Sequence, residues 1–159
     1  MVEFEKIKYA EMNTIVPLIQ SVISDGREAK IRVTGNSMYP MLLDRRDMVK
    51  LSKIDCVKVG DVLLYRRENG DYVMHRVIGR KGDNLAFAGD NEIAREYPVG
   101  TSQCIAKMTG FVRNGVEYDC KANIKYRFIA FLWTRLFCMR SFLAKLFGLY
   151  IKIRRRIKK

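Results

Sequence analysis

Turn signals at short intervals constrain this chain more than any other feature of its sequence. Asn69-Gly70 and Asn114-Gly115 each separate two short apolar stretches. An Asn-Gly pair favours the two-residue turn of a β-hairpin, because both central positions of a type I′ turn need positive φ. Further turn signals occupy residues 59–61 and 81–84. We therefore predict strands over residues 31–34, 48–54, 62–66, 72–78, 85–88 and 103–111.

The predicted strands follow one another without helices between them. Short strands joined only by turns form antiparallel sheets, so we predict a mainly β, compact antiparallel fold. A short helix precedes the strands over residues 8–25, where apolar residues recur at helical spacing until Asp25-Gly26. The 159 residues fit one domain with an appendage. The predicted segments are an N-terminal helical segment (1–29), a β-rich core (30–120) and a C-terminal tail (121–159).

The net charge of +13 is concentrated in the tail. Residues 121–159 contain 12 basic and no acidic residues, whereas the first 120 residues contain 18 basic and 17 acidic ones. A near-neutral body without a recognisable nucleic-acid module argues against a nucleic-acid partner. We also expect no cleavable signal peptide, because the first eight residues are charged and no apolar stretch follows them.

The tail mixes apolar and basic residues and predicts a basic apolar helix. The hypothesis that we favour is a helix on an anionic membrane surface, because its cationic residues attract anionic lipids and its aromatic residues suit the interface. Two alternatives are a membrane span, which would bury charges at roughly 2.5–3.5 kcal/mol each, and a helix that docks on a partner or on RNA. The expected location is the plasma membrane. The candidate membrane-surface residues are Trp133, Arg135, Arg140, Lys145, Arg154, Arg155 and Arg156.

Three polar residues could form an acyl-transfer site. Ser37 lies in a tight Gly-Asn turn, and a serine needs a neighbouring base to act as a nucleophile. The chain has a single histidine, His75, and Asp90 follows it in a Gly-Asp-Asn segment. Such triads are defined by geometry and not by chain order. Each residue alone has an ordinary structural explanation, as a turn former or as a packed histidine.

Four segments together resemble the serine peptidases of the type I signal peptidase and LexA-like group. They are similar to its Ser-Met-x-Pro motif, its Gly-Asp-hydrophobic strand, and the His and Gly-Asp-Asn segments of its histidine-base branch. That branch is found in the endoplasmic reticulum, archaea and some bacteria. In chain order the segments are Gly35-Asn36-Ser37-Met38-Tyr39-Pro40, Gly60-Asp61-Val62, His75-Arg76 and Gly89-Asp90-Asn91.

The resemblance implies a serine endopeptidase with Ser37 as nucleophile, His75 as base and Asp90 as third member. Its substrate would be an extended peptide or precursor protein, bound by pairing with an edge strand. Gly35 stands where signal peptidases usually have a serine, so backbone N–H groups of this turn would hold the oxyanion. The branch often has a further aspartate after Gly-Asp-Asn, and residues 92–96 contain none, which makes Asp90 the sole candidate.

No cofactor or metal is expected, because one histidine and four cysteines without short paired spacing do not suit a zinc site. Free thiols are the default, and a Cys56–Cys104 pair remains open. Two other functions also remain open. One is a catalytically inactive peptide-binding module tethered by the tail. The other is a cytoplasmic leader peptidase or a LexA-like self-cleaving regulator, although one helix is too little for a helix-turn-helix.

Overall fold

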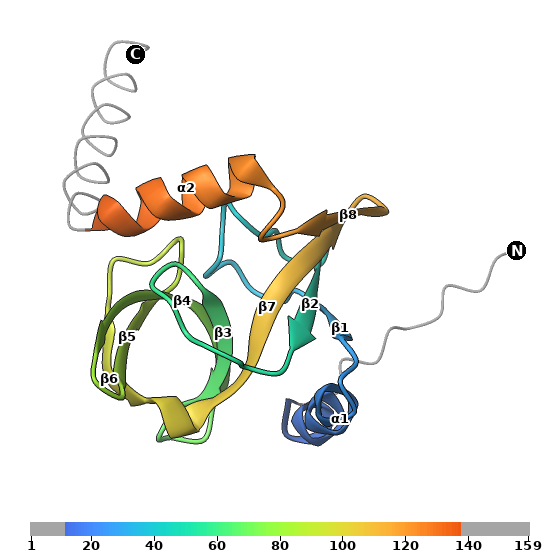
Figure 1. The fold of residues 1–159 in the computed structure, drawn as a ribbon, viewed down its shortest axis with the longest axis horizontal. Coiled ribbons are helices and arrows are strands. Elements are labelled where there is room, and N and C mark those ends of the chain that lie inside the picture. Colours follow the sequence, from blue (N-terminus) through green and yellow to red (C-terminus); the bar gives the residue numbers. More distant parts are fainter. Residues whose placement is uncertain (1–11, 138–159) are drawn as a thin grey trace, which may run out of the picture.

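The computed structural model describes residues 12–137. Figure 1 shows a strongly curled sheet with α2 across one end and α1 beyond the opposite end. In chain order the elements are α1 (Met12–Ser24), β1 (Ala29–Arg32), β2 (Met48–Ser52), β3 (Val62–Arg66), β4 (Tyr72–Lys81), β5 (Asn84–Ala88), β6 (Glu96–Gly100), the 3₁₀ helix η1 (Thr101–Gln103), β7 (Cys104–Arg113), β8 (Val116–Asp119) and α2 (Ile124–Arg135).

The predicted mainly β, antiparallel fold is confirmed. The described strands form one eight-stranded sheet in the order β1-β2-β7-β3-β4-β5-β6, and β8 pairs with β7. Asn114 and Gly115 have φ values of 51° and 79°, as the predicted type I′ turn between β7 and β8 requires. At the turn between β3 and β4, Gly70 has positive φ and Asn69 does not. This turn is therefore a longer loop, closed by the Asp71 carbonyl, which accepts from Arg67 N.

Two strands were not predicted from the sequence. β6 contains Pro98, which lacks an N–H group and is tolerated because β6 is the last strand in the described sheet order. β8 is only four residues long, and most of its side chains are exposed, so it has little apolar periodicity. The predicted helix over residues 8–25 is confirmed from Met12 to Ser24, and its first residues lie outside the described part.

β3 is buried on both faces and separates two apolar clusters. Val62 and Leu64 pack in the cluster that includes α1, β2, β7 and α2, whereas Leu63 and Tyr65 pack in the cluster formed with β4, β5 and β6. Successive side chains of a strand point to opposite faces, which explains why the whole run is apolar. The same alternation in β4 directs neighbouring residues toward different clusters, and this separation shapes the candidate site.

Candidate functional site

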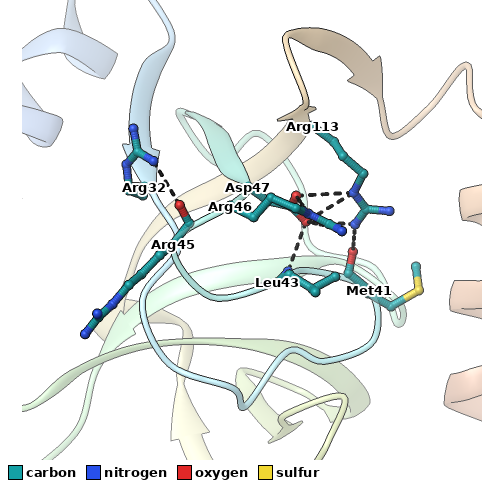
Figure 2. Close-up of polar contacts among 7 residues, drawn as sticks. All are labelled: Arg32, Met41, Leu43, Arg45, Arg46, Asp47 and Arg113. Carbon is teal, nitrogen blue, oxygen red and sulfur yellow. Dashed lines mark hydrogen bonds and ion pairs between the residues drawn. The ribbon is translucent and has the colours of Figure 1, made fainter.

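A buried carboxylate holds the loop that carries Ser37. This loop joins β1 to β2, and the Asp47 side chain at its end is 0% exposed. Asp47 accepts hydrogen bonds from Leu43 N (2.9 Å), Arg46 Nε (2.7 Å) and Arg113 Nη2 (2.8 Å). Figure 2 shows that Arg113 contacts both Asp47 and the Met41 carbonyl. A side chain of β7 therefore binds the loop at two positions.

The charge of Asp47 is retained in the fold. Burial alone would raise the pKa of its carboxyl, but hydrogen bonds from Arg46, Arg113 and Leu43 N outweigh burial and lower the pKa to about 2. The loop is closed by two further contacts, from Val33 N to the Asp47 carbonyl and from Arg45 N to the Val33 carbonyl. The loop that carries Ser37 therefore begins and ends at a fixed point of the sheet.

Gly35 has a conformational reason to be glycine. Its φ is 88°, a backbone conformation that residues with a Cβ rarely adopt, and its N–H donates to the Asp44 carboxylate at 2.9 Å. The other residues of the motif serve the turn or the core. Asn36 is exposed and its carbonyl accepts from Tyr39 N, Met38 is buried in the first cluster, and Pro40 is exposed.

The turn of residues 89–92 contacts the Ser37 loop directly. Asn91 N donates to the Ser37 carbonyl at 2.7 Å, and Glu92 N closes the turn on the Gly89 carbonyl at 3.1 Å. A Cβ on Gly89 would lie 2.6 Å from the Ser37 carbonyl oxygen and 2.9 Å from Glu92 Cδ. Glycine is therefore required at residue 89 by the close approach of the Ser37 backbone.

Gly89→Ala is expected to destabilise the fold by about 1–3 kcal/mol, because the added methyl group must displace the Ser37 backbone. Amide hydrogen exchange should also show lost protection at Asn91. Gly79→Ala is the matched control, since its Cβ would lie at an ordinary 3.6 Å from Ala86 Cβ. Equal urea midpoints for the two variants would contradict the close contact.

His75 lies in β4 and is 2% exposed. Its Nδ1 faces Glu96 Oε1 at 3.1 Å and the Tyr65 hydroxyl at 3.3 Å, while its Nε2 faces Glu92 Oε2 at 3.6 Å. Burial lowers the pKa of the imidazole below its usual value, and the Glu92 and Glu96 carboxylates offset this only in part. The ring is therefore neutral near pH 7, the form in which it can accept a proton.

Glu96 is held in place by Arg67. The guanidinium donates to both carboxylate oxygens, with Nε 2.9 Å from Oε2, and this pairing is the main cause that lowers the pKa of Glu96. An ionised Glu96 beside Nδ1 favours the tautomer with the proton on Nδ1, which leaves the Nε2 lone pair available. The sequence places Glu96 within residues 92–96, where only an aspartate was expected as the third member, so Glu96 was not among the predicted site residues.

Asp90 does not lie against His75, and its predicted place there is taken by Glu96. The Asp90 carboxylate accepts two hydrogen bonds from Arg76, Nε at 2.8 Å and Nη2 at 2.6 Å, and both side chains are 0% exposed. Because His75 and Arg76 are neighbours in a strand, their side chains point to opposite faces. Asp90 lies on the Arg76 face, where it neutralises a buried cation.

The Gly60-Asp61 segment supports this arrangement. The Gly60 carbonyl accepts from Arg76 Nη1 at 2.8 Å, and the Asp61 carbonyl accepts from Val77 N at 2.8 Å. The Asp61 carboxylate pairs with Lys107 at 2.6 Å. These motif residues therefore brace β4 beside His75 and do not themselves contact its ring.

Ser37 and His75 are brought to the same turn but are not hydrogen-bonded. Within residues 12–137, Ser37 Oγ makes no hydrogen bond to another residue, and Glu92 Oε2 lies 3.6 Å from His75 Nε2. A neutral imidazole with its proton on Nδ1 has nothing to donate to Glu92. Catalytic hydrogen bonds are often long in free enzymes and tighten only when substrate binds.

Trp133, a predicted membrane-surface residue, has its indole N–H directed toward the candidate site. It is half-buried, and its indole Nε1 donates to the Asp90 carbonyl at 2.8 Å. Arg135 of the same helix is exposed, as predicted. The other candidate membrane-surface residues, from Arg140 onward, lie outside the described residues.

His75, Glu92 and Glu96 are the described residues whose positions come nearest to a metal site. The two carboxylates approach different ring nitrogens, and both oxygens of Glu96 are already engaged by Arg67. A bound ion would have to displace that guanidinium. The arrangement therefore suits a hydrogen-bonded imidazole better than a metal ligand.

The described cysteines are free thiols, so Cys56 and Cys104 do not form the pair that the sequence left open. Burial raises the pKa of Cys104 and of Cys120 to about 11, which makes both poor nucleophiles near neutral pH. Cys138 lies outside the described residues.

No protein-family model matches this chain, and no curated protein matches it. Within the part of the chain that the structure describes, no helix has the length and apolar character needed to cross a membrane.

Proposed function

We propose that this protein is a serine endopeptidase of the signal-peptidase-like class, with a histidine base. The observation that carries the proposal is the turn of residues 89–92, which contacts both partners. Its Asn91 N–H holds the Ser37 carbonyl at 2.7 Å, and its Glu92 carboxylate lies 3.6 Å from His75 Nε2. The loop that carries Ser37 and the strand that carries His75 thus contact the same turn.

The proposed mechanism uses this support in two proton transfers. Ser37 Oγ attacks the scissile carbonyl while His75 Nε2 takes its proton, and the imidazolium then gives that proton to the leaving amine. Glu96, 3.1 Å from Nδ1, orients the ring and stabilises the imidazolium in place of Asp90. The Ser37 N–H stabilises the oxyanion, a contact worth about 3–4 kcal/mol in comparable sites.

Two features bear on the substrate. β1 ends the described sheet and leads into the Ser37 loop, so its edge can pair with an extended peptide close to the nucleophile. Glu92 must leave Nε2 when a peptide enters. Its side chain is 37% exposed, and turning outward would break the hydrogen bond that its Oε2 accepts from Gly89 N at 3.4 Å. We propose precursor or leader peptides with small residues before the cut.

Ser37→Ala is expected to abolish cleavage. Wild type and variant are incubated in lipid or detergent with a mixture of precursor proteins, and new termini are read by mass spectrometry. Ser102→Ala, an exposed serine in η1, is the matched control and should cleave as wild type does. Cuts that persist in Ser37→Ala would overturn the proposed nucleophile.

The burial of His75 favours a second candidate, a peptide-binding module without catalysis. Its ring is 2% exposed, so a bound peptide reaches Nε2 only after Glu92 moves. Under this hypothesis extended peptides bind to wild type and to Ser37→Ala with equal affinity, and mass spectrometry detects no cut in either mixture or in the chain itself.

A further inference from the structure

The outward face of α2 carries large apolar side chains that no described element covers. Ile124 is 77% exposed, Phe128 62% and Phe131 57%, and Leu132 follows at 40%. Positions three and four apart share one side of a helix, so these side chains form a single face, which we call the outer face of α2. The opposite side of the helix carries the buried Tyr126 and Ala130.

The charged residues of α2 all have one sign. Lys125, Arg127 and Arg135 are exposed beside it, and residues 121–159 contain no acidic residue. The Arg135 guanidinium lies 5.4 Å from the centre of the Phe131 ring, so its stem runs along the apolar surface while its charge stays outside. Asp119 carries an exposed carboxylate just before the helix, at Lys121 N and Ala122 N. The charges of α2 itself are all cationic, and an apolar face with such charges complements a bilayer surface with anionic headgroups.

The inner side of α2 is attached to the candidate site. Trp133 Nε1 donates to the Asp90 carbonyl at 2.8 Å, and the Tyr126 hydroxyl accepts from Arg76 Nη1 at 3.4 Å. The next residue after Asp90 is Asn91, whose N–H binds the Ser37 carbonyl. Figure 1 shows α2 lying across one end of the curled sheet.

We propose that the outer face of α2 docks on an anionic lipid surface, and that this docking steadies the turn of residues 89–92 through Trp133. The regulation of catalysis rests on the proposed peptidase function, whereas the docking does not. The lipid surface places hydrophobic contacts on one side of α2 while Trp133 and Tyr126 hold the other side on the protein. Membrane contact and the support of Ser37 are thereby coupled.

Docking is tested with the full chain and two kinds of vesicle, phosphatidylcholine alone and an equal mixture of phosphatidylcholine and phosphatidylserine. Sedimentation should show at least tenfold stronger binding to the anionic vesicles. The double variant Phe128→Ser/Phe131→Ser should lose at least tenfold of that binding, and Leu18→Ser, which alters an exposed leucine of α1, should lose none. Unchanged binding by the double variant would mean that the outer face does not meet lipid and that the remaining tail alone binds.

The orientation of α2 on the lipid surface is tested by the quenching of tryptophan fluorescence with brominated lipid. Trp133 is the only tryptophan of the chain and therefore the only source of this signal. In the wild type, Trp133 points toward the protein and should be quenched weakly. A tryptophan placed by Phe128→Trp in a Trp133→Phe background should be quenched strongly. The reverse order would overturn the proposed orientation.

The coupling between lipid docking and the turn of residues 89–92 is tested by amide hydrogen exchange, a measurement that does not depend on catalysis. Anionic vesicles should raise the protection of residues 89–92 in the wild type, and Trp133→Phe should retain vesicle binding but lose this gain. Equal protection with and without vesicles would overturn the coupling. Because neither binding nor exchange depends on cleavage, failure of the peptidase proposal leaves both results interpretable.

Discussion

Arg76→Met is expected to lower the free energy of unfolding by about 3–5 kcal/mol, the usual cost of removing one member of a buried ion pair. Arg76 and Asp90 are both 0% exposed, and Asp90 would keep a buried charge without a partner. The loss is measured by urea unfolding, followed by circular dichroism. Trp133 fluorescence gives a second signal, since its indole contacts the Asp90 backbone.

Two further variants distinguish the cost of an unpaired buried charge from the cost of losing an arginine side chain. Arg27→Met removes one member of an exposed pair, with side chains 68% and 59% exposed, and should cost at most about 1 kcal/mol. Arg76→Met/Asp90→Leu removes the whole buried pair and should recover most of the stability. If Arg76→Met cost no more than Arg27→Met, the Arg76–Asp90 pair would not be buried in solution.

Glu96→Gln is expected to reduce serine-dependent cleavage by about 10⁴-fold, the size of loss seen when a carboxylate that orients a catalytic histidine becomes an amide. An amide can present its N–H₂ group to Nδ1, and the proton of the imidazole then moves to Nε2, where Ser37 needs an acceptor. Glu117→Gln, on the exposed side of β8, is the control and should cleave normally. Normal cleavage by Glu96→Gln would exclude it as the orienting carboxylate.

The titration of His75 supplies a readout that is independent of cleavage. Because it is the only histidine, its ring signals in an NMR spectrum need no assignment. Burial lowers its pKa, so the midpoint should lie below 6.5, and Glu96→Gln should move it lower still because a carboxylate that favours the charged ring is removed. A midpoint above 6.5 in the wild type would contradict the buried neutral ring.

The sign of the pH dependence follows from the same shift. Cleavage needs the neutral imidazole, so its rate should fall as pH drops through the lowered pKa of His75. The unfolded chain binds a proton at His75 more readily than the folded chain does. Stability from this residue is therefore present above about pH 6.5 and is lost as pH falls toward the folded pKa.

The sequence predicted the sheet better than it predicted the partners within the site. Turn residues act over a few positions, and so the Asn114-Gly115 hairpin was correctly placed. β6 was not predicted because Pro98 interrupts its pattern. Glu96, which lies beside His75, was not predicted because only an aspartate was expected after Gly-Asp-Asn. Alternation in β4 places His75 and Arg76 on opposite faces, so a single aspartate can pair with only one of them.

The sequence by itself determined the mainly β class, the hairpins and the candidate pair of Ser37 and His75, because these follow from local turn chemistry and from the rarity of one residue type. Only the tertiary structure decided that Asp90 pairs with Arg76, that Glu96 faces His75 and that Trp133 turns inward. A buried charged side chain must pair with an opposite charge, and its partner is a residue that the folded sheet brings close to it. The separation of two residues in the sequence does not reveal which strands and loops meet in the fold.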